Sequence, residues 1–199
     1  MKAILILFLL AFGPASFAQI IINEVQSSNV STLADDFGEY DDWIEIRNAG
    51  SMPVDIGGMV LKDQLDTWAL PTGDVGTLLS PGDFLLLWCD DQEVQGIYHT
   101  NFKLSAANGE FLGLYWADSV TVQDSITIPP LTDDLSFGQC PNVGWAELPT
   151  ATPNLDNDCP TIFPGPGYWL EYCAIEPLTD GEVSIELNYY SGDQFLVEL

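Results

Sequence analysis

The sequence predicts an all-β fold of the sandwich or barrel type, and three observations support this. Short runs of apolar and β-branched residues recur along the chain, separated by turn residues. No segment shows helical periodicity over three turns. The prolines between these runs sit where a missing backbone N–H does least harm; they are Pro53, Pro71, Pro81, Pro129 and Pro130. Many short strands at this spacing are typical of sandwiches and barrels.

The clearest strand is recognised by its alternation. Ile44 and Ile46 fall on one face, and Trp43, Glu45 and Arg47 fall on the other. A hairpin is expected where two apolar runs flank a short polar turn at 117–119. The predicted strands are 20–25, 43–48, 54–56, 59–61, 84–89, 111–116, 120–128, 136–139 and 145–148.

Residues 1–18 have the layout of a secretory signal peptide. Lys2 precedes an apolar run at 3–12 that is too short to span a bilayer as a helix, and small residues lead up to Ala18. We therefore expect a mature chain that begins at Gln19 and is secreted or displayed on the cell surface. No later segment is long and apolar enough for an anchor, so no membrane insertion is expected beyond the signal peptide.

The composition changes after residue 157. Residues 19–157 are predicted to form the main domain, and the Pro- and Gly-rich residues 158–172 are predicted to be a linker. A short β appendage is expected at 173–199, with strand-like runs at 183–189 and 195–199. The sequence stops within or just after the second run, which predicts that the chain is truncated there.

The charge balance limits the kinds of partner. The chain holds 30 acidic and 4 basic residues and a net charge of −26. Such a surface repels phosphate backbones and anionic membranes, so a nucleic-acid partner is disfavoured. Calcium, a cationic partner or simple solvation fits better. Because 47% of the residues are hydrophobic, the charge does not predict disorder.

Four cysteines are present: Cys89, Cys140, Cys159 and Cys173. An even count in a secreted chain favours two disulfides, with three possible connectivities. Cys140 and Cys159 flank a turn-rich loop and are the favoured pair, whereas Cys89 lies in an apolar strand where burial is expected. With one histidine and no CxxC pair, the usual Cys/His zinc site is poorly supplied.

An acidic loop is the main candidate for a metal site. Its carboxylates are Asp35, Asp36, Glu39, Asp41 and Asp42. Hard cations such as calcium take several oxygen ligands on a turning backbone, which Gly38 permits. The spacing is not that of an EF-hand, because Phe37 stands where a second ligand belongs. The alternative is a solvated acidic loop.

Groups that could support catalysis are sparse. His99 is the only histidine, no G-x-S-x-G elbow accompanies it, and a loop position beside Tyr98 and Phe102 is expected instead. No Gly-rich loop followed by lysine could cradle phosphate. Carboxylate pairs for glycoside hydrolysis stay open, because so many carboxylates are present. The six tryptophans invite a sugar-stacking surface, although core packing is expected for most of them.

Several stretches, in order, resemble one family. IIINEVQSSN, FGEYDDWIEIRNAGSMPVDIGGMVLKD and WALPTGDVGTLLSPGDFLLLWCDD resemble the lamin tail domains of bacterial secreted proteins. HTNFKLSAANGEFLGLYWADSVTVQDSI, SFGQCPNVGW and ATPNLDN extend the resemblance to about residues 20–157. It implies an immunoglobulin-like β-sandwich with no catalytic set. The stretch IEPLTDGEVSIELNYYSGDQFLVEL is similar to the start of a type IX secretion C-terminal sorting domain.

Three functions are therefore considered. The favoured one is a non-catalytic secreted or cell-surface interaction or spacer module, with a protein or extracellular polysaccharide as its partner. The second is a calcium- or carbohydrate-binding adhesion domain. The third is an accessory domain of an extracellular hydrolase. The fold alone does not separate them, because one sandwich hosts many functions.

Overall fold

The computed structural model describes residues 20–141 and 143–160 in full, and the backbone of 170–177, 183–189 and 194–198. The described part is all β apart from two short 3₁₀ turns, Val75–Thr77 and Glu93–Gln95. Its strands up to residue 160 are β1 (Ile20–Gln26), β2 (Asp42–Asn48), β3 (Val54–Asp55), β4 (Val60–Lys62), β5 (Thr67–Ala69), β6 (Leu78–Leu79), β7 (Phe84–Cys89), β8 (Glu110–Tyr115), β9 (Val122–Ile128), β10 (Ser136–Cys140) and β11 (Gly144–Leu148).

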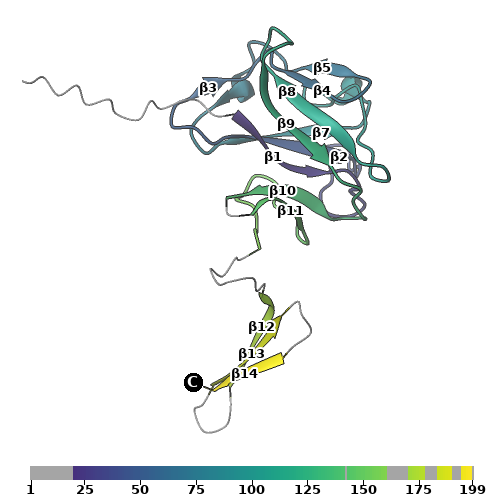
Figure 1. Ribbon diagram of the computed structural model, residues 1–199. Coiled ribbons are helices and arrows are strands. Elements are labelled where there is room, and N and C mark those ends of the chain that lie inside the picture. Colours follow the sequence, from purple (N-terminus) through teal and green to yellow (C-terminus); the bar gives the residue numbers. More distant parts are fainter. Residues whose placement is uncertain (1–19, 142, 161–169, 178–182, 190–193, 199) are drawn as a thin grey trace, which may run out of the picture.

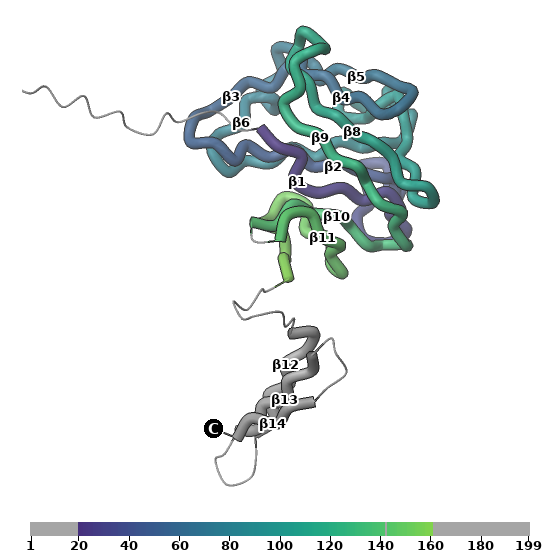
Figure 2. Tube along the Cα trace, viewed as in Figure 1, coloured from purple at the N-terminus to yellow at the C-terminus, as the bar shows by residue number. Residues whose placement is uncertain are grey.

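Two antiparallel sheets pack as a sandwich. The larger sheet has the strand order β11-β10-β1-β2-β7, and the smaller has the order β5-β4-β8-β9. Figure 1 shows β4, β5 and β8 in one layer and β1, β2 and β10 in the other. Figure 2 follows the same path as a continuous tube, with β9 crossing close to β1. The predicted all-β sandwich is confirmed.

Alternation along the strands builds the core between the sheets. Ile44 and Ile46 of β2 are fully buried in it, in the same core cluster as Leu112 and Leu114 of β8 in the other sheet. Burying one such side chain contributes roughly 1.5–3 kcal/mol. The predicted placement of Ile44 and Ile46 on one face of this strand is therefore confirmed.

A bulge in β1 changes which side chains face this core. Ile22 pairs with Ile46, but the next pair along is Glu24 with Glu45, so Asn23 is the extra residue. Before the bulge Ile22 faces inward, and after it Val25 does so, opposite Ile44. The bulge therefore turns Glu24 to the outer face of the sheet.

Trp43 lies on this outer face and is fully buried there. It pairs across the strands with Gln26, and its indole Nε1 donates to Gln26 Oε1 at 2.7 Å. Trp68, in contrast, packs in the main core. Both rings are enclosed by the domain, one on each side of its larger sheet.

Three further strands follow residue 160. They are β12 (Leu170–Pro177), β13 (Val183–Tyr189) and β14 (Gln194–Glu198), in an antiparallel sheet of order β12-β13-β14. β13 has the predicted bounds, and β12 begins three residues inside the predicted linker 158–172. The predicted signal peptide, 1–18, lies outside the described residues.

A disulfide ties the end of β10 to the segment that leaves the sandwich. Cys140 and Cys159 are bridged, with 5.6 Å between their Cα atoms, and this is the pair that the sequence favours. Cys89, at the end of β7, is a buried free thiol, and burial raises its pKa. Among the described residues, no helix has the length and apolar character needed to cross a bilayer.

Removing this disulfide is expected to destabilise the sandwich. The bridge closes a loop with a sequence separation of 19 residues. In the chain-entropy model, its loss costs about 3 kcal/mol. Urea denaturation of a Cys140→Ala/Cys159→Ala variant measures this, and reductant should lower the stability of the wild type but not of the variant. Equal stability of the oxidised wild type and the variant would contradict the prediction.

Candidate functional site

The acidic loop turns tightly around Asp35. Its Oδ1 atom accepts from the backbone N–H groups of Phe37 and Glu39, each at 2.8 Å. The backbone N–H of Gly38 donates to the Asp35 carbonyl at 3.1 Å, and Gly38 itself has a φ of 81°. The loop therefore folds around a carboxylate that is only 9% exposed.

Three of the five predicted metal residues come together. One carboxylate oxygen from each of Asp35, Glu39 and Asp41 lies within 4.8 Å of the other two. Asp36 is exposed and outside this group. Asp42 is also outside it; it is the first residue of β2, and burial raises its pKa to about 6.

Two further residues join the cluster from another part of the chain. Asp35, Asp90 and His99 form a second group whose ligand atoms also lie within 4.8 Å of one another. The pairing of β2 with β7 explains this position. Asp42 is opposite Cys89 in an antiparallel pair, so Asp41, just before β2, comes next to Asp90, just after β7.

His99 is buried and already paired. It is 6% exposed, and its Nδ1 atom contacts Asp90 Oδ2. The ring stacks beside Trp88, with 6.5 Å between centroids, and meets the edge of Phe37 at 6.1 Å. Sequence reasoning did not connect His99 to the acidic loop, although an acidic pair directly after the apolar run 84–89 was a usable signal.

Two oxygens in this cluster lack partners. Asp35 Oδ2 and Asp41 Oδ2 are buried and accept no hydrogen bond. Burial, and next the charge of Asp90, raise the pKa of Asp41. Among the described residues, the ion pairs are Arg47–Asp156 and His99–Asp90, so no lysine or arginine pairs with the acidic loop.

A second polar cluster lies on the outer face of the same sheet. Glu24 and Glu45 are directly opposite each other in β1 and β2, and both are 0% exposed. Burial raises the pKa of both carboxyls, that of Glu45 to about 7. Two buried carboxylates side by side cost free energy unless hydrogen bonds satisfy them.

The segment after β11 supplies most of these hydrogen bonds. Glu24 accepts from the Thr152 backbone N–H and hydroxyl and from the Ser136 hydroxyl. Glu45 accepts from the Asn154 backbone N–H and from the side-chain amide of Asn23 at 2.8 Å. Residues 152–157 are thereby fastened across the sheet.

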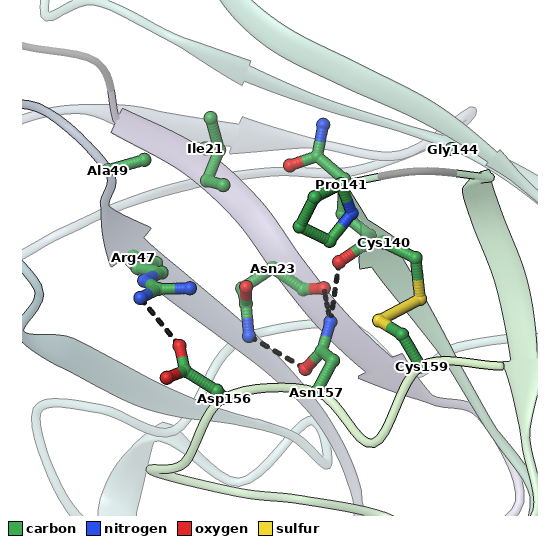
Figure 3. A pocket seen from close by; sticks show the side chains of 11 residues that line it. Ile21, Asn23, Arg47, Ala49, Cys140, Pro141, Gly144, Asp156, Asn157 and Cys159 are labelled. Carbon is green, nitrogen blue, oxygen red and sulfur yellow. Dashed lines mark hydrogen bonds and ion pairs between the residues drawn. A yellow bond between two sulfur atoms is a disulfide. The ribbon is translucent and has the colours of Figure 1, made fainter. Parts of the chain in front are cut away.

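A pocket of about 620 Å³ opens beside this cluster (Figure 3). Asn157 crosses its floor, donating to the carbonyls of Asn23 and Gln139 at 3.0 Å each. Arg47 and Asp156 close one side with an ion pair of 2.6 Å. The Cys140–Cys159 disulfide lines the other side. The pocket is therefore lined by the contacts that hold residues 152–159, which we call the exit segment, to the larger sheet.

These features define an all-β, immunoglobulin-like module. The family model described as Lamin Tail Domain matches residues 14–133, more than half of the chain, and the chain belongs to the lamin tail domain family. The lamin tail domain is a non-catalytic module. No curated protein matches the chain, and no solved structure matches it.

Titration of Glu45 is expected to make stability fall as the pH rises from about 4.5 to about 7. Its pKa is raised from 4.5 to about 7, so the folded state keeps the proton over a range where the unfolded state has lost it. The free energy of unfolding therefore decreases across that range, by up to about 3 kcal/mol. Urea titrations at several pH values measure the slope.

Glu45→Gln should flatten this slope, because the amide does not titrate, although its NH2 group opposes one of the two donors, the Asn154 N–H or the Asn23 amide. Glu147→Gln, at an exposed position of β11, is the matched control and should keep the slope. An unchanged slope in Glu45→Gln would show that other groups cause the pH dependence.

Proposed function

We propose that this chain is a secreted or cell-surface module that joins or spaces other extracellular components. The carrying observation is the fastening of residues 152–159 to the larger sheet, through the buried carboxylates, Asn157 and the disulfide. A domain whose exit segment is bonded to its own sheet holds the following chain at a defined point. Such a design suits spacing and display.

The disulfide and the N-terminal sequence support an extracellular location. Disulfides persist mainly in oxidising compartments. Residues 1–18 have the layout of a signal peptide. The sorting-domain resemblance of residues 173–199 adds a route across the outer membrane to the proposal.

A sugar-binding role receives less support from the aromatic residues. Trp43 and Trp68 are buried, which removes their faces from solvent. Trp145 on β11 stacks instead on Phe137, with 5.4 Å between ring centroids. The acidic surface supports the interaction role better than the aromatic residues support sugar binding. It favours a partner with positive charge or one bridged by cations.

Secretion is tested directly by cell fractionation. The chain of residues 1–199, expressed in a bacterial host, should leave the cytoplasm with an N-terminus at Gln19 and with Cys140 and Cys159 bridged. Leu7→Arg, which interrupts the apolar run, should keep the chain in the cytoplasm. Equal distribution of both versions would overturn the proposed location.

We expect no hydrolytic turnover that depends on His99. Its ring is only 6% exposed and no nucleophile motif accompanies it in the sequence, so it is poorly placed to serve a substrate. The purified protein and a His99→Ala variant should give the same background rates on ester, peptide and glycoside substrates. A rate that is present in the wild type and lost in the variant would refute this.

A further inference from the structure

The loop around Asp35 has an arrangement that its own hydrogen bonds do not explain. Asp35 Oδ1 is fully used, because it accepts from two backbone N–H groups. Asp35 Oδ2 belongs to a side chain that is about nine-tenths buried, yet it has no partner. Asp41 Oδ2 is the second buried and unpartnered oxygen of the same group.

An unpaired buried carboxylate oxygen is costly, and two of them within one group are more so. Like charges at this distance also repel each other. Ion pairs do not relieve this among the described residues, since the ones present involve Arg47 and His99. The charge of Lys103 opposes the rise that burial causes in the pKa of Asp41, but Lys103 is exposed and makes no ion pair with any described residue. A bound cation would satisfy both oxygens.

The ligand atoms decide the class of ion. The group of Asp35, Glu39 and Asp41 offers oxygen only, which hard cations prefer. Asp90 and His99 offer a nitrogen ligand beside Asp35, but these two side chains already satisfy each other. Glu39 is exposed, which leaves space for water ligands. Calcium accepts six to eight oxygen ligands in variable geometry, so it suits three carboxylates completed by water better than magnesium, which requires a near-ideal octahedron.

We infer that Asp35, Glu39 and Asp41 bind one divalent cation of the calcium class and that the Asp90–His99 pair supports the site from the neighbouring loop. The ion lies between the turn at 35–41 and the residues that follow β7. Glu39 already links these segments, because it accepts from the side-chain amides of Gln92 and Gln95, at 3.2 and 2.7 Å. The cation therefore fastens the acidic loop to the larger sheet.

Thermal melts of the purified protein test this. After treatment with EDTA and dialysis, the melting temperature is measured with calcium, magnesium or zinc chloride at 1 mM, and calorimetry measures calcium binding. Calcium at a hundred times its Kd should raise the melting temperature by about 5 °C or more. Magnesium should raise it by less than half as much.

The variants separate an ion site from a merely structural loop. Asp35→Asn keeps Oδ1 to cap the loop but weakens the ligand, and Asp41→Asn removes the second orphaned charge. Both should lose the calcium shift, and Asp41→Asn in EDTA should melt no lower than the wild type, because a repulsive charge has gone. Asp36→Asn, one residue away and exposed, is the matched control and should keep the shift.

Three outcomes would overturn the inference. The first is an unchanged melting temperature with calcium. The second is an equal shift in wild type and Asp41→Asn, which would mean general screening. The third is a larger shift with zinc that disappears in His99→Ala, which would assign the ion to Asp35, Asp90 and His99 instead.

Discussion

The β-bulge at Asn23 determines how the larger sheet divides its two faces. Without the extra residue, strict alternation from Ile20 and Ile22 would point Glu24 into the apolar core. With it, Val25 enters the core, and Glu24 turns outward to sit opposite Glu45. The side-chain amide of Asn23 then donates to both Glu45 and Asn157. One inserted residue therefore supplies both the change of face and part of the compensation for it.

The outer face that results is buried but polar, which is unusual for a sheet in a small sandwich. Covering it requires donors rather than methyl groups, and the exit segment provides them through Thr152, Asn154 and Asn157. The disulfide at Cys159 reduces the conformational entropy that this segment loses on folding. The bulge, the carboxylate pair and the disulfide thus all contribute to covering the outer face of the larger sheet with the exit segment.

Local patterns allowed much of the fold to be predicted. Alternation identified β2, and uniform apolarity identified β7, because each signal lies within one strand. The strands β5 and β6 were missed, because two or three residues give no periodicity; β3 and β4 are equally short but were recognised by their position on either side of Gly57-Gly58. The bulge was missed too, because a single extra polar residue in an apolar run has no signature in one sequence. The disulfide was foreseeable from its turn-rich loop, whereas the Glu24–Glu45 pairing depends on strand register.

The acidic cluster shows the same division between local and distant information. Asp35, Glu39 and Asp41 are close in sequence and were predicted together with Asp36 and Asp42, which lie outside the group of ligand atoms that converges. Asp36 is exposed in the turn, and Asp42 is already the first residue of β2. Asp90 and His99 could only be added once the pairing of β2 with β7 was known.

The two carboxylate clusters of this domain differ in how the buried carboxylates are stabilised. Glu24 and Glu45 are more deeply buried than Asp35 and Asp41, yet both receive hydrogen bonds from the exit segment. Burial raises the pKa of both, and the pKa of Glu45, at about 7, allows a proton to remove its charge near neutral pH. Asp35 and Asp41 each keep a buried oxygen without any donor. The difference between the two clusters is therefore one of donors within the polypeptide, and the cation inferred above would take the place of the donors that Asp35 and Asp41 lack.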